Sequence, residues 1–525
     1  MLGLQSLSSL PLDEVGRLDV VVCAGTALAL VALYVRNKNS FPYPPGPKGL
    51  PVIGNVLDVP PKRQWIQYAQ WSRELDSPII RLNMLGTTMI ILNDLETTTE
   101  FFERRGLIYS NRPRMPMLNE ACGFGWNFGF CEDIEQWKVC RKEFDTRFRQ
   151  ITSRQYREHE VAMTHVLLGK LLNSPERFMQ HLRYMTGSLI LDIAYGIKVK
   201  PENDEYIEIA EKGQEGMEAS GDPNIIDILP WVQHVPSWLP GMRWKKKVDV
   251  WKSWSFKMRD TPYEWVKAQL EKGLAKPSIT TDLIAKFENQ FTDARREYLI
   301  KSTAATAYSA GSDTTVSAFN TLFLVLTLFP EVQKRAHAEI DRVVGSERLP
   351  EFADEDKLPY ITAIIKEILR WAAFVPFAVP HMATQTDVYK GYIIPKNALV
   401  IGNSWAILHD PVVYPDPESF NPSRFLTSDG LKINPDVQDP EVAFGYGRRI
   451  CPGRFMALDS MWISTACILA MFNIGRAVGN NGKVIPLPEE LFNSGLVTHP
   501  TPFKCSITPR SENAARLIQA LGEVH

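Results

Sequence analysis

The distribution of apolar and polar residues along this 525-residue chain predicts mostly helices with a few short strands. Residues 79–82 and 88–92 are short runs rich in aliphatic and β-branched side chains, which favour strands. Helical patterns dominate the rest of the chain, and a long one extends from about residue 297 to 328. Residues 388–394, with Gly391 between two apolar runs, predict a late hairpin. We therefore expect a mainly α-helical protein with small β-sheets.

One apolar segment near the N-terminus has the properties of a membrane span. Residues 20–35 carry no charge, three acidic residues precede them, and Arg36 and Lys38 follow. At about 1.5 Å per residue the segment covers roughly 24 Å, slightly less than the ~27 Å of the endoplasmic-reticulum bilayer. A cleaved signal peptide is the alternative, although acidic residues stand where such a peptide carries basic ones. The basic C-terminal flank predicts a single-pass protein with residues 1–19 in the lumen and the remainder in the cytosol.

A proline-rich stretch follows the predicted span. Residues 36–50 include four prolines between positions 42 and 47, which cannot continue a helix. We expect a stiff hinge between the span and a single domain over residues 51–525. An ordinary proline-rich linker is the alternative.

Composition excludes several classes of protein. The chain has 45% hydrophobic residues, enough for a large core, and its formal net charge is -2, so it lacks the basic surplus of nucleic-acid-binding proteins. Its seven cysteines are odd in number and include no Cys-x-x-Cys pair, which argues against a disulfide framework and for a reducing compartment.

The most informative chemistry lies in residues 444–453. Gly447 can take a positive φ in a tight turn, and Gly453 allows the backbone to approach a flat group closely. Cys451 stands just before a predicted helix, where backbone N–H groups favour a thiolate. Arg449 supplies a positive charge two residues earlier. A small buried cysteine is the alternative.

The complete pattern Phe-x-x-Gly-x-Arg-x-Cys-x-Gly resembles the cysteine loop of the cytochrome P450 superfamily, the haem-thiolate monooxygenases. The resemblance extends from Pro44 to about Arg510 and is strongest to fungal microsomal members. It implies the cytochrome P450 fold, with one domain that encloses haem b. It further implies that Cys451 is the iron ligand and that Phe444, Arg449 and Gly453 contact the cofactor.

A second motif lies in the long predicted helix. Ala307, Ala310 and Gly311 share one face with Thr314, which leaves room beside a hydroxyl group. The segment is similar to the oxygen-activating helix of the family, so Ala310 and Gly311 are expected to face the cofactor. Thr314 is expected to hold dioxygen and water, and Asp313 to relay protons. A buried helix whose threonine bonds to the carbonyl four residues earlier is the alternative.

Two further motifs gain meaning from the resemblance. Glu367 and Arg370 lie one turn apart, and the family implies that they join Arg424 in a buried structural network, although Ser423 replaces the usual acidic residue. Trp137, Arg141 and His381 match the positions of the family that bind the haem propionates.

A basic region surrounds Trp137 and Arg141. In the family this surface meets an acidic NADPH-cytochrome P450 reductase, and cytochrome b5 is a possible second partner. A merely solvated face is the alternative. The basic residues are Lys138, Arg141, Lys142, Arg147 and Arg149.

The positions that contact substrate in the family are apolar or aromatic here, which favours a hydrophobic substrate such as a terpenoid, sterol-like compound, polyketide or xenobiotic. Ordinary core packing is the alternative for each position. They are Phe124, Trp126, Phe128, Ala307, Tyr308, Phe374, Phe377, Leu496 and Val497.

The loop at residues 223–240 combines apolar and aromatic side chains with a following lysine cluster at 245–247. It predicts either a membrane-dipping loop or a loop packed on its own core.

The resemblance implies hydroxylation or another oxidation of a hydrophobic small molecule with O2 and NADPH-derived electrons, typically in secondary metabolism. Two alternatives stay open. One is a haem-thiolate isomerase or dehydratase that does not activate O2, and the other is a membrane-tethered haem- or lipid-binding protein without turnover.

Overall fold

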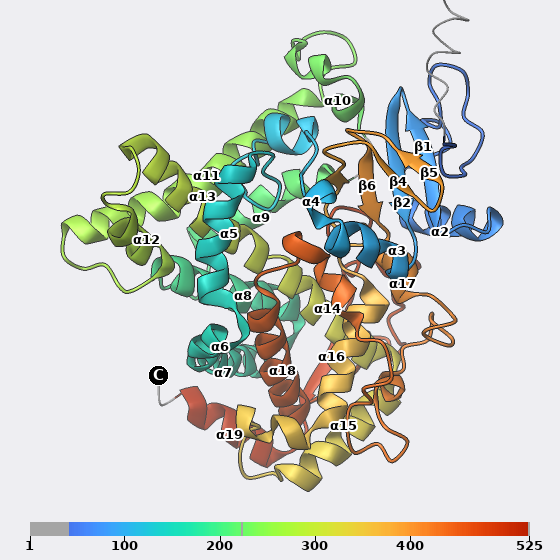
Figure 1. The fold of residues 1–525 in the computed structure, drawn as a ribbon. Coiled ribbons are helices and arrows are strands. Elements are labelled where there is room, and N and C mark those ends of the chain that lie inside the picture. Colours follow the sequence, from blue (N-terminus) through green and yellow to red (C-terminus); the bar gives the residue numbers. More distant parts are fainter. Residues whose placement is uncertain (1–40, 222–223, 523–525) are drawn as a thin grey trace, which may run out of the picture.

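The structure is a computed structural model that describes residues 41–221 and 224–522 (Figure 1). The predicted lumenal tail, the predicted span at residues 20–35 and the first part of the predicted hinge lie outside the described residues. The described part of the hinge is held against small sheets: Pro45 accepts a hydrogen bond from Arg81 N–H at 2.8 Å, and Pro42 accepts one from Ile393 N–H at 2.8 Å.

The described chain is mainly helical, as the sequence predicted. Its α-helices are α2 (Gln64–Glu74), α3 (Leu95–Thr99), α4 (Gly106–Tyr109), α5 (Ile134–Phe148), α6 (Gln150–Ser153), α7 (Arg157–Asn173), α8 (Phe178–Tyr195), α9 (Glu205–Ala219), α10 (Ile225–Ile228), α11 (Lys245–Glu271), α12 (Ile279–Phe287), α13 (Asp293–Gly311), α14 (Thr314–Leu328), α15 (Pro330–Val343), α16 (Pro359–Ala372), α17 (Ser404–Leu408), α18 (Arg454–Met471) and α19 (Glu512–Gly522). Its strands are β1 (Ile79–Met84), β2 (Thr87–Leu92), β3 (His381–Met382), β4 (Asp387–Tyr389), β5 (Tyr392–Ile394), β6 (Leu399–Gly402), β7 (Phe472–Arg476) and β8 (Cys505–Pro509).

The strands form three small sheets in the described residues. The largest has the order β1-β2-β6-β3, in which β2 and β6 run parallel and the other neighbours antiparallel. The predicted late hairpin is β4-β5, and its turn places Lys390 and Gly391 at φ 46° and 82°, the left-handed region that such tight hairpins require. The predicted strands at 79–82 and 88–92 are confirmed as β1 and β2.

The long helix predicted from about residue 297 to 328 is wrong in one respect, because it is interrupted. Helix α13 ends at Gly311, and α14 begins at Thr314. Between them Asp313 has φ -127° and ψ -57°, which is outside the helical region. Glycine and short polar residues are weak helix formers, and the carbonyl of Ser309 accepts from the Ser312 hydroxyl and from Nε2 of Gln214.

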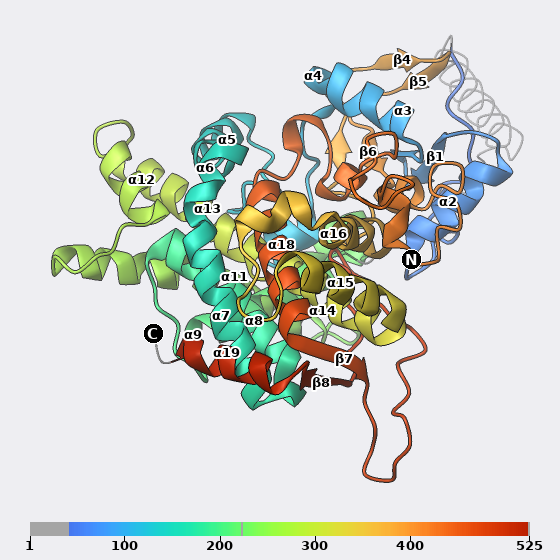
Figure 2. The same ribbon diagram turned by 90° about the horizontal axis from the view of Figure 1, so that it is seen from below.

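Helix α18 lies in the middle of the helical part of the molecule in both ribbon views (Figure 1, Figure 2). It packs against α7, α14, α15 and α16, and one large apolar cluster joins these elements. Within the described residues α18 has the length and hydropathy of a membrane span, but 72% of it is buried inside the protein, as in a core helix. A second cluster joins α5, α8, α11 and α13. The two clusters hold α13, α14 and the start of α18 at fixed positions.

Candidate active site

The loop that carries Cys451 is held by its own backbone. Gly445 and Gly447 have φ 85° and 51°, as the sequence predicted for Gly447. A Cβ on Gly447 would overlap the carbonyl oxygen of Phe102. The N–H of Cys451 donates to the carbonyl of Phe444 at 2.8 Å, and α18 begins just after Gly453. Cys451 is therefore fixed at the N-terminal end of the central helix.

The surroundings of Cys451 act on its thiol in opposite directions. Burial raises the pKa of Cys451, whereas the backbone N–H groups of Gly453 and Arg454 and the charges of Arg141 and Arg454 oppose that rise. The net pKa stays above the ordinary value. A bound metal cation deprotonates a coordinating thiol. If such a cation were bound, Cys451 would be a thiolate, and the N–H groups and arginines around it would stabilise the negative charge.

Arg449 is a buried cation that forms no ion pair with an acidic residue of the described chain. It is 8% exposed, its Nε donates to the carbonyl of Ser110 at 2.9 Å, and its guanidinium lies 4.1 Å from the centre of the Trp137 ring. Neither Nη atom has a hydrogen-bond partner among the described residues. Burial lowers the pKa of Arg449 to about 10. Buried guanidinium nitrogens normally bond an anion, so the unpaired nitrogens of Arg449 indicate an anionic ligand at this position.

Arg112 and His381 are two more buried basic side chains close to Arg449. The Arg112 guanidinium donates to the carbonyls of Gly129, Val379 and Pro380. Burial, and secondly the charge of Arg449, hold the pKa of Arg112 well below its ordinary value.

His381, on β3, bonds the carbonyl of Tyr109 through Nδ1 at 2.6 Å. Burial and then the charge of Arg112 lower its pKa strongly. In the described chain no carboxylate forms an ion pair with Arg112 or Arg449. Sequence reasoning missed Arg112, whose one local signal is the lack of any acidic residue between positions 104 and 119.

Arg141, unlike Arg449, is paired with a carboxylate. Its Nε pairs with Asp145 at 2.9 Å, and its Nη1 donates to the carbonyl of Ile450 at 2.5 Å. Asp133 caps the helix that carries it, α5, by accepting from Glu135 N–H and Gln136 N–H. Arg141 therefore braces the backbone next to Cys451.

Helix α13 leaves open space near its C-terminal end. Ala310 is exposed although Ser309 and Ser312 on either side are buried, and Thr314 is half-buried. The hydroxyl of Thr314 donates to the carbonyl of Ala310 at 3.0 Å, which is the bond that the alternative interpretation described. This bond uses the hydroxyl proton and leaves the oxygen lone pairs able to accept.

Gly311 and Ala307 lie on packed surface. A Cβ on Gly311 would come 2.9 Å from Cγ1 of Ile190, so the glycine allows α13 to approach α8. Ala307 is buried in the second apolar cluster. In the described structure the open space is beside Ala310 and Thr314.

The structure brings Glu367, Arg370 and Arg424 together. Glu367 accepts two bonds from Arg370, at 2.7 and 2.9 Å, and one from Arg424 at 3.1 Å. The two arginines also donate to carbonyls of the segment between residues 408 and 419. Ser423, the departure from the family pattern, accepts from Arg335 at 2.7 Å. The network ties α16 to the chain that leads to the cysteine loop.

The first three predicted substrate positions lie between α5, α11 and α13. Trp126 donates its indole N–H to Ser255 at 2.9 Å, and its ring neighbours that of Phe124. The N–H of Phe128 donates to Thr306 on α13 at 3.2 Å. All three rings are buried.

The remaining predicted substrate positions are spread over several contacts. Tyr308 is fully buried and donates its hydroxyl to the carbonyl of Tyr206. Phe377 packs on Trp65 and Tyr68 of α2.

Phe374 lies close to the segment that carries Leu496 and Val497. The N–H of Thr498 donates to the carbonyl of Phe374 at 2.8 Å, and Ser317 on α14 donates to the carbonyl of Thr498 at 2.5 Å. These contacts place residues 496–498 between the turn after α16 and α14.

The predicted basic region is partly neutralised. Besides Arg141, Arg147 is largely buried and pairs with Glu143, which also holds Lys286. Lys142 and Arg149 are exposed.

Together the fold and the site define a protein that places a half-buried cysteine and a cluster of buried bases beside an interrupted helix, in surroundings suited to an anionic group. Comparison with known proteins agrees. The sequence model of the cytochrome P450 family matches residues 44–507. A cytochrome P450 monooxygenase of Armillaria gallica is 41% identical over 499 residues, covering 93% of this chain and 97% of the relative. A tryptamine 4-monooxygenase of Psilocybe cyanescens is 40% identical over 481 residues, covering 90% of this chain and 94% of the relative.

The chain belongs to the cytochrome P450 family. It is an oxidoreductase of the monooxygenase type, and its cofactor is haem held through a cysteine thiolate.

Proposed function

We propose that the protein inserts one oxygen atom from O2 into a hydrophobic small molecule, with Cys451 as the iron ligand. One observation carries this proposal. The buried terminal nitrogens of Arg449, two residues before Cys451, have no hydrogen-bond partner in the described chain. A haem propionate is the anion that such a position would hold.

The buried bases fit a cofactor with two carboxylates. Arg449, Arg112 and His381 would hold the propionates, and Trp137 would keep the Arg449 guanidinium in place. Arg141 would support the cysteine loop through Ile450. Bound haem supplies the iron that accepts electrons and reacts with O2.

Thr314 and Asp313 would supply protons in this reaction. Thr314 stands at the open side of the helix and can accept a hydrogen bond from water while it donates to Ala310. Asp313 is adjacent and can return a proton to that hydroxyl through water.

We propose a neutral, apolar substrate from secondary metabolism. The candidate contact positions carry no carboxylate that could pair with an ammonium group. An uncharged terpenoid or polyketide fits these surroundings better than a cationic amine such as tryptamine, the substrate in the name of one relative.

We propose that the electrons come from NADPH through a separate cytochrome P450 reductase, with cytochrome b5 as a possible second donor. The exposed cations Lys142 and Arg149 on the α5 side support an acidic partner. Replacing Lys142 and Arg149 by Glu is expected to raise the reductase concentration needed for half-maximal turnover, and unchanged kinetics at low salt would contradict this docking surface.

We further propose a single-pass anchor at residues 20–35 in the endoplasmic reticulum, with the catalytic domain in the cytosol. Trp231 and Trp238 support a second membrane contact because they are 62% and 78% exposed, and Lys246 and Lys247 are exposed nearby. Carbonate extraction of microsomes tests the anchor: the full chain should stay in the pellet, and release into the supernatant would contradict it.

Two measurements test the central proposal. The reduced, carbon-monoxide-treated holoprotein should show the absorption of a thiolate-ligated haem, and Cys451→Ala should lose it together with turnover. Incubation with reductase, NADPH and a panel of apolar metabolites plus tryptamine should then yield a product heavier by one oxygen atom. A porphyrin-free protein, or a Cys451→Ala variant with normal turnover, would overturn the proposal.

Thr314→Ala should divert NADPH consumption into hydrogen peroxide, because the reaction would lack its ordered hydroxyl. Thr315→Ala, at the next position, is the matched control and should keep normal coupling. Equal coupling in the two variants would remove Thr314 from the proposal.

A further inference from the structure

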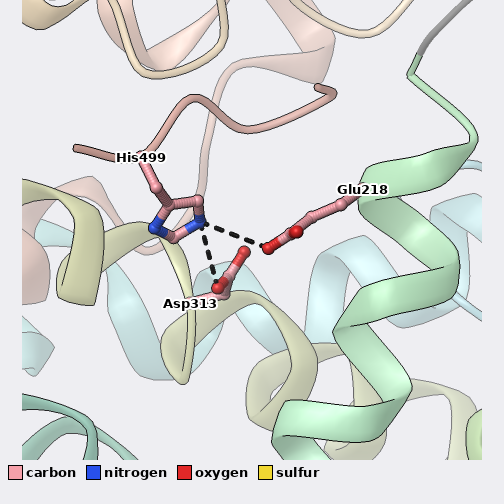
Figure 3. A group of neighbouring side chains, drawn as sticks. All are labelled: Glu218, Asp313 and His499. Atoms are coloured by element: carbon pink, nitrogen blue, oxygen red, sulfur yellow. Dashed lines mark ion pairs between the residues drawn. The ribbon is translucent and has the colours of Figure 1, made fainter. Parts of the chain in front are cut away.

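Three titratable side chains from distant segments meet beside the break between α13 and α14 (Figure 3). Glu218 lies in the last turn of α9, Asp313 precedes α14, and His499 lies in the loop before β8. Nε2 of His499 is 3.2 Å from Oδ1 of Asp313 and 3.6 Å from Oε1 of Glu218. One ring nitrogen therefore faces both carboxylates.

The side chain of Asp313 faces His499 and does not cap helix α14. It occupies the N-cap position of α14, where an aspartate normally accepts a backbone N–H bond and contributes about 1 kcal/mol. Its side chain makes no such bond and turns toward the imidazole (Figure 3). The position of this carboxylate is thus set by His499 and by Arg183, whose Nη1 is 3.9 Å away.

The carboxylates of the cluster outnumber the nearby guanidinium by one, so the cluster can hold one additional proton. Asp313 and Glu218 face one nearby guanidinium, that of Arg183, so one negative charge is unbalanced unless His499 or Glu218 is protonated. Glu215 and Glu211 also act on the group, but both are exposed.

The pKa shifts agree with that count. Burial alone would lower the pKa of His499, but Asp313 and Glu218 outweigh burial and Arg183 and raise it. Burial, and then the charge of Asp313, raise the pKa of Glu218.

The three side chains form a gradient from the surface to the interior. The exposed fractions are 33% for Glu218, 9% for His499 and 4% for Asp313. Neither nitrogen of His499 has an aligned hydrogen bond within the described residues, so a small rotation of the ring decides which carboxylate Nε2 bonds. Glu218 can exchange protons with solvent, whereas Asp313 can do so only through its neighbours.

We infer that Glu218 and His499 form the proton entry path that recharges Asp313. The proton leaves the Glu218 carboxyl for the lone pair on Nε2, so one O–H bond breaks as one N–H bond forms. It then passes from Nε2 to Asp313, which restores the neutral imidazole, and Glu218 takes a new proton from solvent. No electrons move in these steps. The inference rests on the proposed role of Asp313 and assigns relay roles to Glu218 and His499.

Histidine NMR tests the path without turnover. In the holoprotein labelled with 15N-histidine, the signal lost in His499→Gln identifies this residue among the nine histidines. Its titration midpoint should lie above the ordinary value of about 6.5. Glu218→Gln should lower the midpoint, and Glu205→Gln, exposed in the first turn of the same helix, should leave it unchanged. A His499 that stays neutral from pH 5 to 8 would overturn the inference.

Oxygen uptake driven by NADPH and reductase tests the same path in action and needs no added substrate. Each O2 reduced to hydrogen peroxide takes up two electrons and two protons. General acid catalysis is typically worth 10²–10⁴-fold and water can partly replace a relay, so we expect His499→Gln to slow uptake about tenfold. Its solvent deuterium isotope effect should rise, and the alkaline limb of the pH profile should move to lower pH in Glu218→Gln.

The carbon-monoxide spectrum distinguishes a failure of the proposed function from a failure of the proton path alone. If the wild-type protein lacks the thiolate-haem spectrum, the proposed function fails. If the spectrum is normal and Thr314→Ala diverts NADPH into peroxide, yet His499→Gln and Glu218→Gln keep the wild-type rate and isotope effect, the proton path alone is wrong.

Discussion

Arg370 and Glu367 form a two-bond ion pair that is completely shielded from solvent. Nε of Arg370 is 2.7 Å from Oε2 and Nη2 is 2.9 Å from Oε1, and neither side chain has any exposed surface. The remaining guanidinium N–H bonds go to backbone carbonyls of residues 408, 417 and 419. Two charges thus hold one helix against an irregular segment that has little regular backbone pairing of its own.

Removing one member of this pair should strongly destabilise the protein. Glu367→Gln would leave Arg370 and Arg424 without a counter-charge, and breaking a buried pair typically costs about 3–5 kcal/mol. We expect that loss in the free energy of unfolding measured in urea, together with loss of haem. Glu135→Gln, which breaks the exposed pair with Lys138, is the control and should change stability by less than about 1 kcal/mol. Equal stabilities of the two variants would contradict a bracing role.

Gly447→Ala should disrupt the cysteine loop more than a comparable change elsewhere. Gly447 has φ 51°, and its added Cβ would overlap the carbonyl of Phe102. Gly482 has φ 75° but no atom within 4 Å of an added Cβ. Gly482→Ala should therefore cost only about 1–2 kcal/mol of backbone strain, whereas Gly447→Ala should also lower the haem content of the purified protein. Full haem content in Gly447→Ala would show that the overlap is relieved by a small shift.

Arg449→Met should weaken haem binding without unfolding the protein. Bonds to charged groups contribute about 1.5–3 kcal/mol each, so haem loss to an acceptor protein should accelerate roughly tenfold or more. Arg448→Met, at the adjacent exposed position, should leave the rate unchanged. Equal rates in the two variants would mean that the Arg449 nitrogens do not hold a propionate.

The stability of the protein should fall as the pH rises from about 5 to 8 because of Glu160. Burial raises the pKa of Glu160 to about 8, although Ser460 donates to its carboxyl at 2.9 Å. The folded state therefore retains a proton that the unfolded chain has lost above its ordinary pKa, so raising the pH through this window favours unfolding.

Glu160→Gln should remove that slope and be relatively more stable at pH 8 than at pH 5, compared with the wild type. Glu158→Gln, exposed on the same helix, should keep the wild-type slope. Thermal unfolding of the holoprotein at both pH values measures the difference, and parallel curves for all three proteins would contradict an ionisable group at position 160 that is neutral at pH 7.

Much of the fold was accessible from local pattern. The strands at residues 79–82 and 88–92 and the 388–394 hairpin follow from runs of apolar residues and from one glycine. The interruption of the 297–328 helix was missed, because hydrophobic periodicity continues across Ser312 and Asp313. At the break the carbonyl of Ser309 accepts from the side chains of Ser312 and Gln214, and hydrophobic periodicity does not register such contacts.

The functional region divides in the same way. The sequence alone identified the cysteine loop, because its glycines and its cysteine act through backbone geometry within ten neighbouring positions. Its expectation that Gly311 faces the cofactor stays a prediction, and the structure adds that this glycine lets α13 pack on Ile190.

Only the tertiary structure decided which charges lie together. The charge of Arg449 acts on Arg112 across more than three hundred residues of sequence, and His499 faces Asp313 and Glu218, which come from two other segments. Electrostatic interaction depends on distance in space and on burial, and neither is written in the order of residues along the chain. The sequence determined which residues the cysteine loop contains, and the packing of the helices determined where the protons and anions can reside.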